Sequence, residues 1–145
     1  MTVRKGTYIL VITLRSPRLV KVGALGEHLF DPGTYVYTGS AMGGLDQRVS
    51  RHLRKEKNIR WHIDNLTTVC DCCEAYESYP DFVPECTLAR TAVECGAVPE
   101  MKGFGCSDCD CETHPFRAGS DTVSKLVAKA SLAPFTDKRR RASVQ

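Results

Sequence analysis

The sequence predicts an α+β fold in which a small central antiparallel sheet, of three strands or slightly more, is flanked by helices. Short runs rich in β-branched and aromatic residues are separated by turn signals, which is typical of successive antiparallel strands. An apolar stripe with helical spacing follows the third run. A length of 145 residues is that of one domain with a sizeable core.

Three strands are expected before the first helix. Residues 6–14, GTYILVITL, are apolar on both faces, as in a central strand. Ser16-Pro17 turns the chain, and residues 19–25 alternate loosely as the next strand. Asp31-Pro32-Gly33 is a turn signal before the third strand at 34–39.

The first helix begins after this third strand. Leu45, Val49 and Leu53 recur at i, i+4 and i+8, which is one apolar stripe of a helix. Arg48 and His52 are four residues apart beside that stripe, so they are neighbours close to the strand end that carries Tyr37. Arginine can bind phosphate oxygens while phenol and imidazole move protons, so the group suits phosphate chemistry. The alternative is a solvated basic face beside a core tyrosine.

The second half of the chain has weaker signals. Residues 61–66 predict a short helix, and residues 72–79 a strand that Pro80 ends. Pro84 is typical of the first turn of a helix, which we expect to run to Glu94 and to end at Gly96.

The C-terminal part contains an irregular segment and a last helix. Residues 99–119 lack periodicity and are rich in glycine, cysteine and acidic residues. Ser120 is the expected N-cap of the last helix, and Pro134 its stop. We expect one domain over residues 1–136 and a basic tail over 137–145, disordered as such tails are by default.

Composition limits the classes of partner. The hydrophobic fraction of 42% and the charged fraction of 26% are those of an ordinary globular protein. A net charge of +3 is only mildly basic, so affinity for nucleic acid has to come from local clustering, which residues 48–60 supply. The sequence lacks a run of the ~20 apolar residues that span a bilayer and lacks a signal peptide, so we expect a cytoplasmic protein without a membrane partner.

Two tripeptides carry a resemblance to a known family. Gly6-Thr7-Tyr8 and Tyr37-Thr38-Gly39 resemble the paired tripeptides of the GIY-YIG endonuclease superfamily, and Gly39-Ser40-Ala41 leading into Arg48-x-x-Arg51-His52 is similar to its homing-endonuclease members. Three further segments resemble a small stand-alone branch of unassigned biological role: Trp61-His62-Ile63-Asp64, Glu85-Cys86 and residues 103–109, GFGCSDC.

Two departures from the family pattern have structural meaning. Threonine replaces the middle isoleucine of both tripeptides, and both residues are β-branched and suit a strand. The 28 residues between Tyr8 and Tyr37 exceed the usual link, so an extra strand or long hairpin is expected there.

The resemblance implies a GIY-YIG-like fold and a metal-dependent endonuclease that hydrolyses phosphodiester bonds in DNA, in DNA repair or recombination. One Mg²⁺ or Mn²⁺ would be held by Glu85; a hard cation keeps most of its waters, so one carboxylate suffices. Tyr8 and Tyr37 would be the active-site phenols, with a nearby cation favouring phenolate, while Arg48 neutralises charge and His52 assists proton transfer. The alternative is a catalytically inactive nucleic-acid-binding module of the same fold, with or without a stabilising zinc, and a third hypothesis is a zinc-stabilised interaction protein. Without the resemblance, Glu85 is an ordinary first-turn glutamate and the tyrosines are core residues, a role that we expect for Tyr35.

Two further groups are candidates for binding. DNA phosphates are expected to contact the cations of the first helix and the loop after it: Arg51, Arg54, Lys55, Lys57 and Arg60. Four residues within nine positions have the softness that zinc prefers but crowd a tetrahedral site: Cys106, Cys109, Cys111 and His114. The alternative for them is a set of thiols and a histidine without metal.

Overall fold

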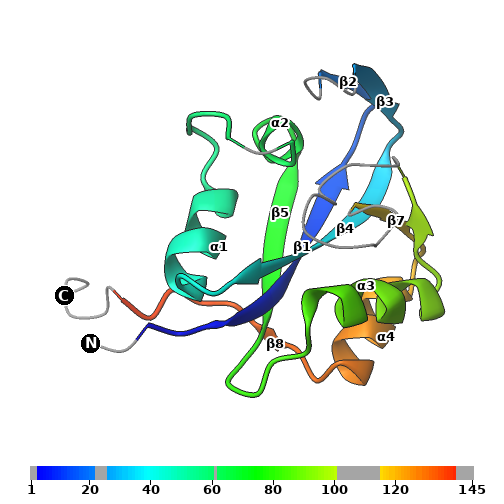
Figure 1. Ribbon diagram of the computed structural model, residues 1–145. Coiled ribbons are helices and arrows are strands. Elements are labelled where there is room, and N and C mark those ends of the chain that lie inside the picture. Colours follow the sequence, from blue (N-terminus) through cyan, green and yellow to red (C-terminus); the bar gives the residue numbers. More distant parts are fainter. Residues whose placement is uncertain (1–2, 22–25, 61, 101–114, 140–145) are drawn as a thin grey trace.

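A computed structural model describes residues 3–21, 26–60, 62–100 and 115–139 of the chain. Within these residues the α+β prediction is confirmed, and the antiparallel sheet has six strands, which is larger than the three or slightly more expected (Figure 1). The strand order is β6-β7-β4-β1-β5-β8. The strands are β1 (Gly6–Leu14), β4 (Gly33–Ala41), β5 (Cys72–Ser78), β6 (Val98–Pro99), β7 (Phe116–Ala118) and β8 (Ala133–Pro134).

The two longest strands, β1 and β4, form the centre of the sheet. They pair antiparallel over their whole length, from Gly6 opposite Ala41 to Leu14 opposite Gly33, and this register puts Tyr8 opposite Gly39. On its other side β1 pairs with β5. The predictions of strands at 6–14 and 72–79 are therefore confirmed.

The predicted second strand at 19–25 does not join this sheet. Strand β2 (Arg18–Lys21) pairs with β3 (Glu27–Phe30) as a separate two-stranded hairpin, and residues 22–25 lie outside the described part. The reason is that β4 occupies the whole edge of β1, so the intervening residues can pair only with each other. Val20 and Phe30 are buried and anchor the hairpin to the core. This hairpin accounts for the long link between Tyr8 and Tyr37.

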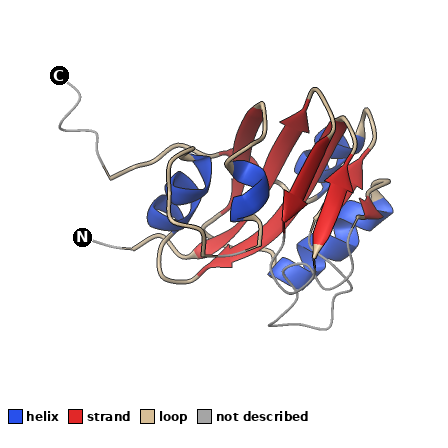
Figure 2. Ribbon diagram, turned by 90° about the horizontal axis from the view of Figure 1, so that it is seen from above, coloured by secondary structure: helices blue, strands red, loops and turns tan. Residues whose placement is uncertain are grey.

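Helices cover both faces of the sheet (Figures 1 and 2). α1 (Leu45–Leu53) and α2 (Asp64–Thr67) lie on one face, and α3 (Glu85–Glu94) and α4 (Thr122–Lys129) on the other. Side chains of a strand alternate between its faces, so Leu10 and Ile12 pack with α1 and α2 while Ile9 packs with α3 and α4. The sheet thus separates two apolar cores.

The helix predictions are confirmed for α1 and α3, and revised for the other two. α2 is shorter than the helix expected at 61–66 and is shifted toward the C-terminus, and Trp61 lies outside the described residues. Asp121 rather than Ser120 is the N-cap residue of α4. β6 and β7 were not predicted, because strands of two and three residues are too short to show a period.

Both ends of the described chain meet at α1. The carbonyl oxygen of Arg4 accepts a hydrogen bond from the Leu45 amide at the start of α1. At the other end, the Lys138 amide donates to Asp46 and the Ser50 hydroxyl donates to Asp137. Residues 137–139, at the start of the predicted tail, are thus hydrogen-bonded to the body of the domain, while residues 140–145 lie outside the described part.

Candidate active site

A buried tyrosine–histidine pair joins the sheet to α1. Tyr8 of β1 is 2% exposed, and its hydroxyl lies 2.8 Å from Nε2 of His52. The backbone of Gly39 is what leaves room for the phenol, because a Cβ at this position would lie 2.4 Å from Tyr8 Oη. Small size, rather than conformational freedom, is therefore what the site requires of Gly39.

His52 is held neutral. Burial lowers its pKa to about 3, and the positive charge of Lys57 adds to this shift while Asp64 opposes it. At neutral pH a neutral imidazole presents one nitrogen that can accept a proton. The Tyr8–His52 contact is therefore a hydrogen bond between a phenol and an uncharged ring.

Tyr37 of β4 completes the aromatic part of the site. Its ring centroid lies 6.2 Å from that of His52. Burial raises the pKa of both Tyr8 and Tyr37 above that of a free phenol, and the charge of Glu85 acts in the same direction. The cation expected to favour phenolate is present as Arg48, but it does not outweigh burial. Both phenols are therefore protonated at neutral pH.

Ser40 connects the groups that reach the site from the two faces of the sheet. Nη1 of Arg48, from α1, donates to the Ser40 carbonyl oxygen at 2.9 Å. The Ser40 hydroxyl donates to Oε1 of Glu85, the first residue of α3, at 2.5 Å. Neither Ser40 nor Gly39 is predicted as a site residue from the sequence, and both lie within β4, which continues to Ala41 beyond the strand expected at 34–39.

The five residues predicted as catalytic thus come from four elements and lie together around one end of β4. Their charges act on one another, since Arg48 and Glu85 both shift the pKa values of the two tyrosines. β7 pairs only with Thr34–Val36, so among the described residues no strand covers that edge of β4 from Tyr37 onward. The five residues predicted as catalytic are Tyr8, Tyr37, Arg48, His52 and Glu85.

The cations predicted to bind DNA fall into two groups. Arg51 forms a bidentate ion pair with Asp64, which is fully buried, at 3.0 and 2.8 Å. Nζ of Lys55 donates to the Cys70 carbonyl oxygen, and Nζ of Lys57 donates to the His52 carbonyl oxygen at 2.6 Å. These three side chains hold α1 and the following loop to the domain. Arg54 and Arg60 are exposed, as is Lys55 despite its hydrogen bond to Cys70.

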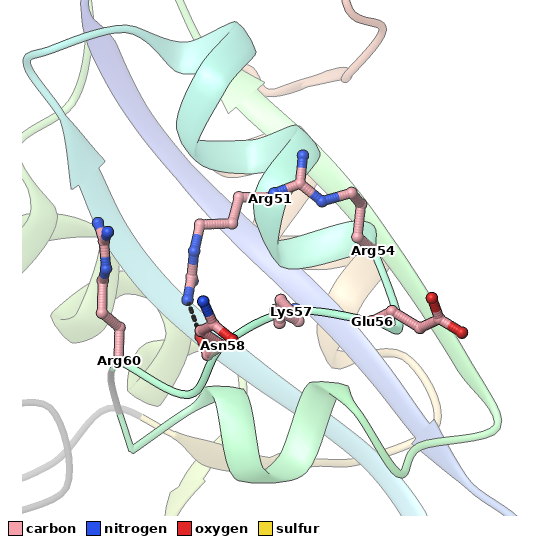
Figure 3. A pocket seen from close by; sticks show the side chains of 6 residues that line it. All are labelled: Arg51, Arg54, Glu56, Lys57, Asn58 and Arg60. Carbon is pink, nitrogen blue, oxygen red and sulfur yellow. Dashed lines mark hydrogen bonds between the residues drawn. The ribbon is translucent and has the colours of Figure 1, made fainter.

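A basic hollow lies between the end of α1 and the loop that leads to α2 (Figure 3). Its volume is about 550 Å³. Arg51 reaches across it to the Asn58 carbonyl oxygen at 2.6 Å (Figure 3). Four of its six lining residues are cationic and one is acidic: Arg51, Arg54, Glu56, Lys57, Asn58 and Arg60. The hollow therefore suits an anionic group.

The predicted metal ligands are of two kinds. Glu85 is half-buried and belongs to the site described above. Cys106, Cys109, Cys111 and His114 lie outside the described residues. Within residues 3–21, 26–60, 62–100 and 115–139, no three His, Cys, Asp or Glu side chains are grouped to hold a metal ion. A cation bound through one carboxylate and water does not require such a group.

Comparisons with known proteins identify the family. None of the helices in the described residues has the length and hydropathy to cross a bilayer. No curated protein and no solved structure matches the chain. Residues 7–133 match a family described as "Domain of unknown function DUF123". This match covers most of the 145 residues, and the chain therefore belongs to the DUF123 family.

Proposed function

We propose that this protein is a metal-dependent endonuclease that hydrolyses phosphodiester bonds in DNA, as the resemblance to the GIY-YIG superfamily implies. The observation that carries the proposal is the meeting of Tyr8, Arg48 and Glu85, which are distant in sequence, at one end of β4. Phosphodiester hydrolysis needs an activated water, charge stabilisation on phosphoryl oxygens and help for the leaving oxygen. The site contains a neutral imidazole that can accept a proton, a guanidinium that can stabilise charge and a carboxylate that can hold a cation.

Arg48 and the Tyr8–His52 pair have complementary roles in this proposal. The Arg48 guanidinium neutralises charge that develops on the phosphoryl oxygens. Neutral His52 accepts a proton through the hydroxyl of Tyr8, since the two atoms are within hydrogen-bond distance. This route needs no stable phenolate, which agrees with the raised pKa of Tyr8.

Glu85 would hold the divalent cation. Its carboxylate and the Ser40 hydroxyl form an all-oxygen donor set beside the open strand edge, which fits the preference of Mg²⁺ or Mn²⁺. When bound, such a cation acts as a Lewis acid toward the phosphate and lowers the pKa of its water.

DNA is the proposed substrate because a basic hollow, which suits phosphate, lies at the end of the helix that carries His52. Arg51 lines the hollow and is followed directly by His52, so a phosphate in the hollow and one at the site could belong to one strand. Exposed Arg54 and Arg60 would make contacts with the phosphate backbone that release counterions.

A catalytically inactive nucleic-acid-binding module is the second candidate. The observation that favours it is the deep burial of Tyr8, which keeps its phenol protonated and away from solvent. In this alternative the same cations bind DNA, and the Tyr8–His52 pair only stabilises the packing of α1 on the sheet.

A cleavage assay tests the proposal. Supercoiled, branched, flapped and single-stranded DNA would be incubated with the purified protein and Mg²⁺ or Mn²⁺, and products would be separated on denaturing gels. The endonuclease proposal expects metal-dependent products from at least one substrate. Binding to DNA without products from any substrate with either metal supports the binding module instead.

Glu85→Gln separates the two candidates. The amide keeps the size of the side chain but loses the charge that holds the cation, so cleavage should fall by a factor on the order of 100 or more while DNA binding is retained. Cleavage rates and binding isotherms measure the two effects. Glu94→Gln is the matched control, because Glu94 lies in the same helix but pairs on the surface with Lys129. Equal cleavage by both variants and the unaltered protein would exclude the proposed role of Glu85.

A further inference from the structure

Two thiols lie next to each other where the chain enters β5. Cys70 precedes the strand and is 5% exposed, and Cys73 is its second residue and half-buried. Both side chains belong to the apolar core that α1 covers, Cys70 as a buried member and Cys73 as a partly buried residue packed against it. Both cysteines are free thiols. The pair takes no part in the proposed nuclease chemistry.

Lys55 brings a positive charge to this pair. Its ammonium nitrogen lies 3.3 Å from Cys70 Sγ and also donates to the carbonyl oxygens of Thr67 and Cys70. As a thiol, Cys70 donates to the Thr67 carbonyl oxygen at 3.4 Å. As a thiolate it accepts from Lys55 instead. Both protonation states of Cys70 therefore have partners in the fold.

The two sulfurs differ in acidity. The hydrogen bond from Cys73 and the charge of Lys55 lower the pKa of Cys70 against the effect of burial. The hydrogen bond with Cys70 and burial raise the pKa of Cys73, which the more distant charges of Lys57 and Lys55 oppose. The pair thus loses one proton readily and retains the other, as expected of two interacting groups. This combination provides one nucleophilic sulfur beside one thiol.

We propose that Cys70 and Cys73 are a reversible redox pair that a peroxide oxidises to an intramolecular disulfide, with Lys55 as the positioning residue. The Cys70 thiolate attacks one peroxide oxygen, the O–O bond breaks, and Cys70 becomes a sulfenic acid as one water leaves. The Cys73 sulfur then attacks Cys70 Sγ, the S–O bond breaks, and a second water leaves. Two electrons pass from the sulfurs to the peroxide, and a thiol reductant reverses the change.

Cys72 lies between Cys70 and Cys73 in the sequence. It neighbours Cys73 in β5, but successive residues of a strand point to opposite faces, so Cys72 points away from Cys70. Cys73 packs instead with the core that α1 covers. Replacement of Cys72 therefore provides a matched control.

Peroxide treatment followed by mass spectrometry tests the proposal. The reduced protein is treated with hydrogen peroxide, its remaining thiols are alkylated under denaturing conditions, and it is digested before aspartate. Cleavage before Asp71 separates Cys70 from Cys73, so their disulfide holds two peptides together. Cys72→Ser should leave this linked product unchanged. A product in which other cysteines are oxidised while Cys70 and Cys73 are both alkylated overturns the proposal.

Variants that keep the surrounding packing separate chemistry from structure. In Cys73→Ser the reaction should stop at a sulfenic acid on Cys70, which dimedone traps. In Lys55→Met the rate at pH 5, below the pKa of about 6 that Cys70 has beside Lys55, should fall by up to about tenfold for each unit by which that pKa rises, and should recover at higher pH. A purely structural role of Lys55 would not move the pH profile. Identical profiles for Lys55→Met and the unaltered protein would refute the assignment.

Discussion

Gly39 is the residue whose size decides whether the site can form. It lies opposite Tyr8 in the β1–β4 register, and the phenol occupies the space where a side chain would be. Tyr8 and Tyr37 could be predicted as site residues from the sequence. The requirement for space at Gly39 could not, because it depends on which residue the register puts opposite.

Gly39→Ala should displace the Tyr8 ring and break its contact with His52. We expect a loss of about 1–3 kcal/mol in the free energy of unfolding, as for overpacking of a core, together with loss of cleavage. Urea denaturation and the cleavage assay measure the two effects. Gly43→Ala is the control, because nothing lies within 4 Å of its added Cβ. Equal stability of the two variants would contradict the close contact.

The buried neutral state of His52 predicts a pH dependence of stability. Its folded pKa, about 3, is below the unfolded value near ~6.5, so the unfolded chain binds more protons between these values. The contribution of neutral His52 to the free energy of unfolding is fully present above pH 6.5 and is lost as the pH falls toward 3. We expect the free energy of unfolding to decrease by about 1 kcal/mol between pH 6.5 and 5.5. Urea denaturation at both values should show a smaller decrease in His52→Gln, whereas His62→Gln should behave as the unaltered protein does.

At the scale of elements, α1 combines two functions that its sequence pattern does not distinguish. Leu45 and Val49 form the buried stripe that the spacing predicts. The basic residues that follow were predicted as one DNA-binding group. The structure instead places Arg51 against buried Asp64 and leaves Arg54 exposed.

Arg51→Ala and Arg54→Ala should therefore have different effects. Removal of Arg51 leaves the Asp64 carboxylate buried without its partner, so we expect a loss of about 3 kcal/mol in stability. Arg54→Ala should change stability by less than about 0.5 kcal/mol, but should lower DNA affinity and reduce the slope of log affinity against log salt by roughly one. Denaturation curves and salt titrations check both. A stable Arg51→Ala variant would argue against the structural role.

At the scale of the whole molecule, Arg4 joins segments from both ends of the chain. Its guanidinium donates to Asp46 of α1 and Glu77 of β5, and also to the Thr136 carbonyl oxygen at 3.3 Å. Only 12% of the Arg4 side chain is exposed, so this network is shielded from solvent. It fastens α1 to β5 at Glu77, which is opposite Tyr8 in the sheet.

Arg4→Met should destabilise the whole domain, because it leaves two shielded carboxylates unpaired. We expect a loss of about 3 kcal/mol at pH 7. Burial raises the pKa of Asp46, but the hydrogen bonds from Arg4 and from the Lys138 amide outweigh this effect, so the pKa is lowered overall. The stabilisation by Arg4 is therefore lost as the pH falls, and the gap between the two proteins should narrow below about pH 4. Arg90→Met, a change at an exposed arginine of α3, is the control in urea denaturation. A gap that does not depend on pH would contradict the ion-pair origin.

The sequence by itself determined the features that depend on neighbouring residues. The central strand, the strand that ends before Pro80, the stripe of α1 and the start of α3 after Pro84 all follow from periods and turn signals within about ten residues. The tripeptides and the Arg48–His52 spacing also selected the candidate site residues. Their catalytic and DNA-binding roles remain predictions.

Only the tertiary structure decided which distant residues meet. The contact of Ser40 with Glu85 joins residues 45 positions apart, and the pairing of β1 with β4 excludes the β2–β3 hairpin from the main sheet. Burial likewise keeps the phenols protonated and sets Arg51 against Asp64. Strand register, desolvation and ion pairing depend on the packing of the whole chain, and no local pattern of residues encodes them.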